Sequence, residues 1–260
     1  MRKRIIKRVV TSAVQIGTSN IIRKAGVNNN PSSPKNNLNT VIPRDNNTLN
    51  WGKVDMSTVV YSKVDPLFKN ETVFIVGGGP SLKDFNWDLL KGKRVIAINK
   101  AIYVYPNADI IYWTDNRFYK WYKNDIDALS GLKYTIQPSP NQENVKILRK
   151  GNRHGLEINP SLIAHGDNSG YAAINIAYHL GAKNIVLLGY DMGNDNGKSH
   201  FHDGYPVSHT SDDVYQNRFM TGFPILAEEL KQRGIKVFNA SSISKLTCFS
   251  KISIKDALLL

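Results

Sequence analysis

Three histidines lie close together in the stretch KSHFHDGYPVSHTSDD at 198–213. The ordinary pKa of histidine is close to neutral, so His200, His202 and His209 are candidates for moving a proton during a reaction. His200 and His202 also form a His-x-His pair near carboxylates, a pattern that can bind a metal ion. A polar surface loop without a catalytic role has the same composition. The spacing alone leaves these three interpretations open.

Oxygen-bearing side chains precede these histidines. Asp191, Asp195 and Asn196 could hold Mg²⁺, because hard cations prefer oxygen ligands and nucleoside diphosphates usually bring this ion with them. Their spacing does not match an EF-hand loop, and a flexible acidic loop would show the same residues. A requirement for Mg²⁺ would therefore distinguish an enzyme that uses a magnesium-bound nucleotide from one that works without a metal ion.

The second chemical feature is the stretch VFIVGGGPSL at 73–82, an apolar run that ends in three glycines, a proline and a serine. Glycines between a strand and a helix let backbone N–H groups converge on an anion, and the helix dipole favours negative charge there. The stretch lacks the Gly-Lys-Ser/Thr end of a P-loop and the third glycine of a Rossmann fingerprint. A tight corner without a ligand is the alternative, but the pattern favours a phosphate site.

Short apolar strands alternate with helices from Glu71 onward. The expected strands cover 72–77, 94–99, 109–115, 134–139, 184–192 and 235–241, and the expected helices cover 80–90, 169–181 and 219–233. This alternation predicts a doubly wound α/β domain, with a mostly parallel, Rossmann-like sheet that is covered on both faces.

Small or polar residues follow the expected strands. In a parallel α/β sheet, ligands bind outside the carboxyl ends of the strands. The residues at these ends are Gly77, Gly78, Gly79 and Ser81, then Asn99 and Lys100, then Thr114, Asp115 and Asn116, then Gly189, Tyr190 and Asp191, and finally Asn239, Ser241 and Ser242. Such a set can surround a nucleotide-sized ligand.

The net charge of +13 is concentrated near the N-terminus of the 260-residue chain. Residues 1–69 contain 12 Lys and Arg but 3 Asp and Glu, whereas residues 70–260 contain 22 and 18. The body is therefore nearly neutral, and we expect no specific nucleic-acid partner. The single cysteine, Cys248, excludes an internal disulfide and fits a reducing, cytoplasmic location.

The charge pattern divides the chain into three parts. Residues 1–26 form a basic arm with apolar residues at roughly helical spacing. This pattern fits a helix that lies on an anionic membrane surface or docks on a partner, and it equally fits a short helix packed on its own domain or a frayed terminus. Residues 27–70 are rich in Asn, Ser and Pro and are expected to be a linker or surface segment. Residues 71–260 form the predicted nucleotide-binding α/β domain.

Several of these motifs together resemble a known family. GGGPSL, the strand that ends in Asn99, and NSGYAAINIAYHLGAKNIVLLGYDM at 168–192 are similar to the bacterial sialyltransferases of glycosyltransferase family 42. That family shows G-N-G-P-S-L, a strand ending in C-N, then S-G, an Ala-rich helix and a strand ending in G-x-D. The framework also resembles the archaeal 6-hydroxymethylpterin diphosphokinase-like family and glycosyltransferase-like proteins of bacteriophages. The likeness covers roughly residues 72–215, and NASSISKLTCFSKI at 239–252 is closer to the latter two groups.

The resemblance implies a GT-A-like sialyltransferase variant of the Rossmann-like fold, and it implies roles for individual residues. Gly77, Gly79 and Ser81 would lie against a nucleotide phosphate, while Gly78 stands where the family has asparagine. The other nucleotide-binding candidates are Asn99, Asp115, Ser169, Gly170, Gly189 and Asp191.

The same resemblance implies a reaction. SHTSDD lines up with the G-H-S segment that carries the family's general base, so His209 is the first candidate for this base and His202 the second. The implied activity is transfer from a CMP-sugar to a glycan or small alcohol acceptor without a required cofactor or metal. The alternatives are an ATP-dependent, Mg²⁺-requiring 6-hydroxymethylpterin diphosphokinase-like enzyme and a non-catalytic phage structural or host-interaction protein.

Overall fold

The structure is a computed structural model that describes residues 50–194, 200–201 and 210–260. The predicted arm at 1–26, the first part of the segment 27–70, and His202 and His209 lie outside the described residues. In the described part of the chain, no helix combines the length and the apolar character needed to cross a membrane.

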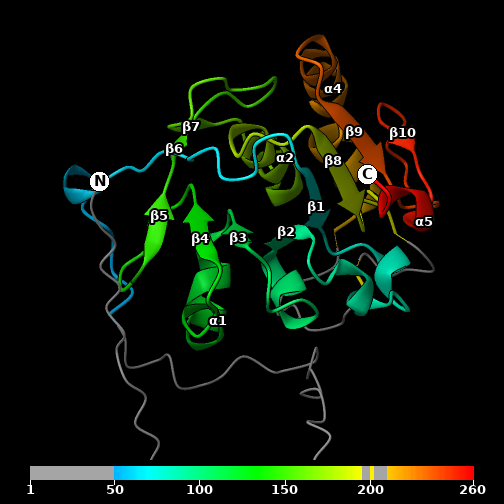
Figure 1. Ribbon diagram of the computed structural model, residues 1–260. Coiled ribbons are helices and arrows are strands. Elements are labelled where there is room, and N and C mark those ends of the chain that lie inside the picture. Colours follow the sequence, from blue (N-terminus) through cyan, green and yellow to red (C-terminus); the bar gives the residue numbers. More distant parts are fainter. Residues whose placement is uncertain (1–49, 195–199, 202–209) are drawn as a thin grey trace, which may run out of the picture. The chain divides into compact units, whose positions relative to one another are not determined.

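Eight strands form one parallel sheet in the order β10-β9-β8-β1-β2-β3-β4-β5 (Figure 1). Their bounds are β1 Thr72–Val76, β2 Arg94–Ile98, β3 Ile110–Trp113, β4 Leu132–Thr135, β5 Val145–Ile147, β8 Asn184–Leu188, β9 Lys236–Asn239 and β10 Ser250–Lys251. A separate parallel pair consists of β6 Arg149–Lys150 and β7 Leu162–Ile163. The predicted doubly wound, mostly parallel α/β fold is thereby confirmed.

Helices and tight turns connect the strands. The α-helices are α1 Asn116–Asp127, α2 Ser169–His179, α3 Asp212–Val214, α4 Phe223–Gln232 and α5 Ile254–Ala257. The 3₁₀ turns are η2 Met56–Thr58, η3 Pro80–Leu82, η4 Trp87–Leu90 and η5 Asn99–Tyr103, and η6 Tyr215–Phe219 is a π-helical turn.

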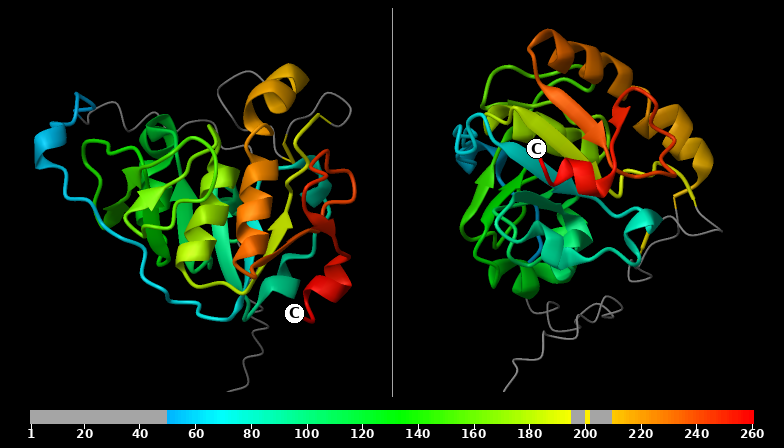
Figure 2. Two further views of the ribbon diagram at one scale, coloured as in Figure 1. Left: turned by 90° about the horizontal axis from the view of Figure 1, so that it is seen from above. Right: turned by 45° about the vertical axis from the view of Figure 1, so that its right-hand side comes forward.

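Both faces of the sheet are buried. One face packs against α2 and α4, which lie side by side in Figure 2, and the other packs against α1, η5 and α5. Val73 to Val76 in β1 are all buried, because successive side chains point to opposite faces and both faces are covered. This is why the strands appear in the sequence as continuous apolar runs.

The prediction of a helix at 80–90 is wrong. Two 3₁₀ turns, η3 and η4, occupy the stretch, separated by residues that include Asn86 in an extended conformation. The Asn86 side chain accepts the N–H of Asp88 at 3.1 Å, so it caps a new turn where an α-helix would have to continue. Consequently no α-helix begins directly after the glycines.

The second half of the predicted segment 27–70 packs on the sheet edge. The N–H of Ser62 donates to the carbonyl of Ile147 at 2.7 Å, and Tyr61 forms a parallel bridge with the same residue. Val64 and Phe68 are buried in the core on the α2 side. This stretch therefore extends the domain beyond β5.

Candidate functional site

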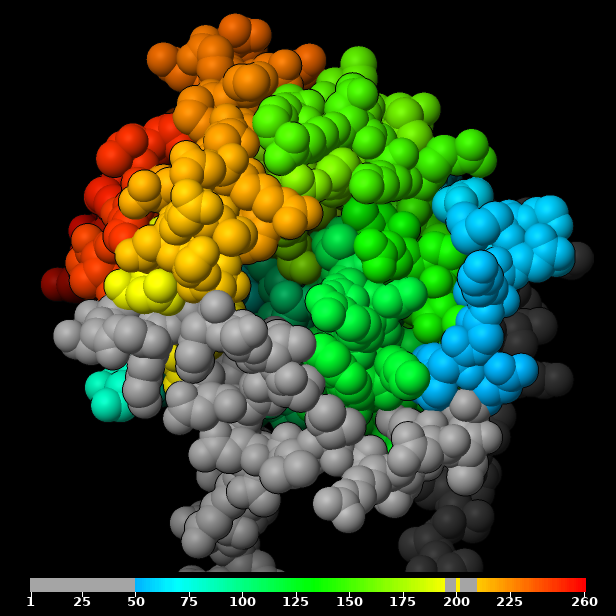
Figure 3. Space-filling model, turned by 180° about the vertical axis from the view of Figure 1, so that it is seen from behind, coloured from blue at the N-terminus to red at the C-terminus, as the bar shows by residue number. Residues whose placement is uncertain are grey.

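A cleft of about 730 Å³ lies at the carboxyl edge of the sheet. Its walls come from the segments that follow β1, β2, β3, β4 and β8, together with the start of α2 and residues of η6. In Figure 3 the recess lies between the yellow-orange segment and the green segments, with teal atoms at its floor. Strands β1 and β8 are neighbours in the sheet, but the chain continues from β1 to β2 on one side and from β8 to β9 on the other. The cleft therefore lies at a topological switch point.

Eight of the ten predicted nucleotide-binding residues line this cleft, although they come from five separate segments of the chain. They are Gly77, Gly78, Gly79, Asn99, Asp115, Ser169, Gly170 and Gly189. The two that do not line it are Ser81 and Asp191, which bond to each other. The cleft is also lined by side chains that the motifs did not single out, including Lys150, His165, Asp167 and Arg218.

Asp191 is a buried acceptor that joins three strand ends. One carboxylate oxygen accepts the N–H of Ser81 at 2.7 Å, and the other accepts the hydroxyls of Ser81 at 2.6 Å and Ser241 at 2.5 Å. Its side chain therefore ties the segment after β8 to the segments after β1 and β9. We call Ser81, Asp191 and Ser241 the serine–aspartate clamp. It holds the glycine turn of residues 77–79 in place.

Two of the three backbone N–H groups of the glycine turn are bonded within the protein. The carbonyl of Leu188 accepts the N–H of Gly77 at 2.8 Å, and the carbonyl of Gly189 accepts that of Gly79 at 2.9 Å. Pro80 has no N–H, and that of Ser81 belongs to the clamp. The N–H groups of Gly77, Gly79 and Ser81 are therefore not available to converge on a phosphate in this geometry. What the glycine turn can offer a ligand is a backbone that the ligand can approach closely.

Not every glycine of the turn faces ligand space. A Cβ on Gly79 would lie 2.5 Å from the Asp191 carboxyl carbon and 2.6 Å from the Gly189 carbonyl oxygen. A Cβ on Gly78 would meet only the His200 ring, at 3.2 Å. Gly79 is thus required by the packing of the protein itself, whereas Gly78 borders the cleft beside His200.

Asn99 connects the end of β2 to the start of α2. It has the left-handed φ of +51°, which asparagine tolerates better than most residues, and its amide nitrogen lies 3.5 Å from the Ser169 hydroxyl. The following residue, Lys100, is buried with its ammonium over the rings of Tyr103 and Tyr122, and burial lowers its pKa to about 8. Lys100 is therefore part of the core and does not line the cleft.

Asp115 lies in the wall of the cleft that is formed by the segment after β3. Its carboxylate caps α1 by accepting the N–H of Arg117 at 2.9 Å, and it pairs with the guanidinium of the same residue at 2.5 Å. That guanidinium lies 5.7 Å from the centroid of the Trp121 ring. This wall thus combines a neutralised ion pair with an aromatic surface.

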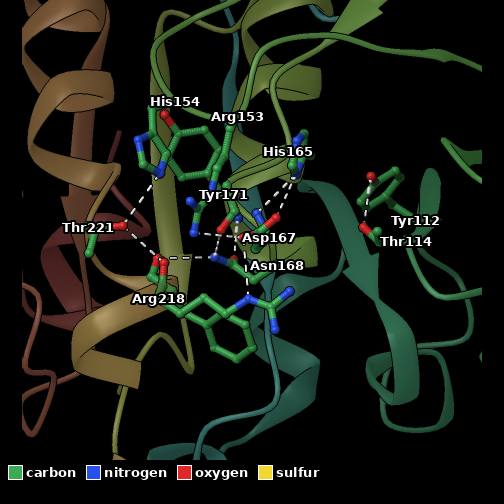
Figure 4. Close-up of polar contacts among 12 residues, drawn as sticks. Tyr112, Thr114, Arg153, His154, His165, Asp167, Asn168, Tyr171, Arg218 and Thr221 are labelled. Carbon is green, nitrogen blue, oxygen red and sulfur yellow. Dashed lines mark hydrogen bonds and ion pairs between the residues drawn. The ribbon is translucent and has the colours of Figure 1, made fainter. Parts of the chain in front are cut away.

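The start of α2 is fixed by Asn168. Its side-chain oxygen accepts the N–H of Tyr171 at 2.8 Å, and its amide donates to the carbonyls of Gly166 at 3.0 Å and Phe219 at 3.2 Å (Figure 4). The last bond fixes η6 against α2. As in any α-helix, the first N–H groups, here those of Ser169 and Gly170, have no acceptor within the helix. They lie at the positive end of the helix dipole.

Charged side chains surround Asp167, just before α2 (Figure 4). One of its carboxylate oxygens lies 2.9 Å from a terminal guanidinium nitrogen of Arg153 and 3.3 Å from Nε of Arg218. Burial alone would raise the pKa of Asp167, but the hydrogen bond from Arg218 and the charges of Arg153 and Arg218 outweigh it, so the pKa lies below its usual value. Asp167 is therefore ionised at neutral pH. We call Lys150, Arg153, His165, Asp167 and Arg218 the Asp167 cluster.

His165 belongs to this cluster as a neutral ring. Burial, with the charge of Lys150 next, lowers its pKa below the ordinary value, so it is uncharged at neutral pH. Its Nδ1 accepts the N–H of Asp167 at 3.1 Å, which places the ring proton on Nε2. Sequence reasoning gave His165 no role. The signals that could have found it are KGNRH at 150–154 and HGDNS at 165–169, two polar stretches of which the second leads into α2.

The histidine loop can be placed only in part. His200 and Thr210 line the cleft, and the N–H of Phe201 donates to the Gly78 carbonyl at 3.0 Å. His202 and His209, together with Asp195 and Asn196, lie outside the described residues. Within 50–194, 200–201 and 210–260, no three His, Cys, Asp or Glu side chains gather in a way that could hold a metal ion.

Comparison with known proteins gives a distant structural likeness. No protein-family model and no curated protein sequence matches the chain. Two structures of the sialyltransferase CstII from Campylobacter jejuni, in complex with the substrate analogues cytidine-5'-monophosphate and CMP-3FNeuAc, are similar in fold. The first match has 16% identity and a TM-score of 0.45, covering 71% of this chain and 86% of that chain. The second has 14% identity and a TM-score of 0.41, covering 70% and 85%.

Proposed function

We propose that this chain is a nucleotide-sugar-dependent glycosyltransferase that transfers a sugar to an acceptor hydroxyl. The observation that carries the proposal is the cleft at the switch point between β1 and β8, where eight predicted ligand-binding residues from five segments come together. A corner that served packing alone would not require polar groups from so many segments to face one cleft. A volume of about 730 Å³ is also within the usual range for small-molecule sites.

The geometry suggests where the parts of a nucleotide would bind. Gly78 allows close approach of a ligand, and the Asn99 amide and Ser169 hydroxyl are suited to the polar edge of a ribose or base. The phosphate is better served by the N–H groups at the start of α2, which have no acceptor within the helix, than by the glycine turn, because most amides of that turn are occupied. The predicted ligand residues remain the same, but the expected phosphate position moves from the turn toward Ser169 and Gly170.

The donor and the general base follow from the motif resemblance. The family pattern favours a CMP-sugar donor, and His209, with His202 second, remains the proposed base that deprotonates the acceptor. His209 immediately precedes Thr210, and His202 follows the pair His200–Phe201. Because His200 and Thr210 line the cleft, this part of the chain is suited to supplying the base.

Thermal denaturation in the presence of nucleotides tests this function. We expect CMP to raise the melting temperature without Mg²⁺, since a ligand at 100 times its Kd adds about 2.7 kcal/mol of apparent stability. UDP, GDP and ATP, each with and without Mg²⁺, serve as comparisons. Stabilisation by ATP only when Mg²⁺ is present would favour the diphosphokinase-like activity, and no shift with any nucleotide would favour a non-catalytic role.

A further inference from the structure

Cations outnumber carboxylates on one side of the cleft. Arg153 and Arg218 pair with the single carboxylate of Asp167, and Lys150 adds a further positive charge near the neutral His165. Lys150 forms no ion pair with a carboxylate among the described residues. The Asp167 cluster therefore has an excess positive charge, and Lys150 and Arg218 face the same cleft as Gly78.

Other acidic side chains near the cluster are engaged elsewhere. Glu157 accepts the N–H of Asn152 at 2.7 Å, and Glu229 accepts the N–H of Leu156 at 2.5 Å. Asp213, close to Arg218 in the sequence, accepts the Asn217 amide at 2.7 Å. None of these carboxylates forms an ion pair with Arg153, Arg218 or Lys150 in the described structure. The positive charge is thus not balanced by them.

Arg218 retains unused donors. A guanidinium has five N–H groups, and within the described residues Arg218 uses only Nε, at 3.3 Å from Asp167. Its side chain is 59% exposed, whereas that of Asp167 is 18% exposed. The Asn168–Phe219 bond fixes the backbone of the neighbouring residue against α2. Arg218 is therefore held at one nitrogen, with its terminal nitrogens available to a ligand in the cleft.

We propose that the Asp167 cluster is an oxyanion subsite that takes a second negatively charged group of the substrate, a phosphate or a carboxylate, in addition to the first phosphate of the nucleotide. The inference rests on the proposed function, because it specifies which substrates the same cleft prefers. Arg218 and Lys150 supply the charge, and Asp167 with Arg153 holds Arg218 in place. Planar guanidinium groups suit such oxyanions because they can bind two oxygens at once.

Two sources can supply the second oxyanion, and paired ligands distinguish them. CDP differs from CMP by one phosphate, and glucuronate differs from glucose chiefly by one carboxylate. Titration calorimetry with these four ligands gives two affinity ratios, CDP to CMP and glucuronate to glucose, for the wild type and for each variant. In the wild type we expect at least one ratio to favour the more charged ligand by about tenfold or more, as one or two charge-assisted hydrogen bonds would give.

Substitutions assign that preference to the cluster. Arg218→Gln should bring the ratio in which the wild type prefers the more charged ligand close to one, and Lys150→Gln should lower the same ratio. Arg117→Gln is the matched control, because it removes an exposed arginine from the same cleft that is already paired with Asp115. We expect this control to leave the ratio near the wild-type value. Circular dichroism checks that each variant is folded.

The outcomes separate this inference from the proposed function. A preference for CDP identifies a phosphate subsite, and a preference for glucuronate identifies a carboxylate subsite. If neither charged ligand is preferred by the wild type, or if Arg117→Gln removes the preference as fully as Arg218→Gln, the subsite is refuted. Failure of the proposed function would instead appear as absence of CMP binding, and the glucuronate and glucose titrations do not depend on CMP.

Discussion

Replacing Asp191 with alanine is expected to lower the free energy of unfolding by about 2–4 kcal/mol, because it removes the buried, charged acceptor of three hydrogen bonds, one of them from the buried Ser241. The three donors are the N–H and hydroxyl of Ser81 and the hydroxyl of Ser241. The loss also removes the bonds that hold the segment after β8 against the segments after β1 and β9. Urea denaturation followed by circular dichroism measures the difference.

Asp115→Ala is the matched control for this prediction. Asp115 also follows a strand and also accepts a backbone N–H, but its side chain is 43% exposed. We expect this substitution to cost roughly 1 kcal/mol, the usual value for losing a helix cap. Equal destabilisation by the two substitutions would show that the serine–aspartate clamp is not a main support of the glycine turn.

Replacing His209 with alanine is expected to lower kcat by about 10²–10⁴, the usual contribution of a general base, with little change in nucleotide affinity. The base must be neutral to accept the acceptor's proton, so the wild-type rate should fall as the pH drops through the pKa of His209. The variant should lose this acidic limb of the pH–rate profile. Steady-state kinetics over a pH series, with a CMP-sugar donor and a glycan or small alcohol acceptor, measures both effects.

His202→Ala and His200→Ala are the comparisons for His209. His200 lines the cleft beside Gly78, so its loss should change nucleotide affinity more than the acidic limb of the pH profile. A large loss of kcat in His202→Ala with near-normal turnover in His209→Ala would move the base to His202. Near-normal turnover in both variants would contradict a histidine base in this loop.

The strands and the cleft could be predicted from the sequence because parallel strands buried on both faces give continuous apolar runs. Val73–Val76 and Ile185–Leu188 show this pattern, and the residues after such runs must meet at one edge of the sheet. The gathering of Gly78, Asn99 and Ser169 follows from topology alone. It does not depend on the details of any turn.

The hydrogen bonds within the site could not be predicted in the same way. Asp191 and Ser81 are polar residues at strand ends, and sequence cannot tell whether such residues bind a ligand or each other. The Asp167 cluster depends on η6 packing against α2 through the Asn168–Phe219 bond, a contact between positions 51 residues apart. The turn at 80–90 depends on Asn86, whose side chain competes with the helix for a backbone N–H.

The most direct test of the account is nucleotide binding to a variant whose cleft is filled at the glycine turn. Gly78→Leu places a side chain beside His200, where a Cβ meets only the His200 ring at 3.2 Å, and Gly78→Ala is the graded control. Titration calorimetry with CMP should show saturable binding to the wild type, a smaller loss for Gly78→Ala, and at least a tenfold loss for Gly78→Leu, with melting temperatures of the free proteins within about 4 °C of each other. Equal CMP affinity in the wild type and Gly78→Leu, or no nucleotide binding to the wild type, would contradict the proposal that this cleft binds the nucleotide of a sugar donor.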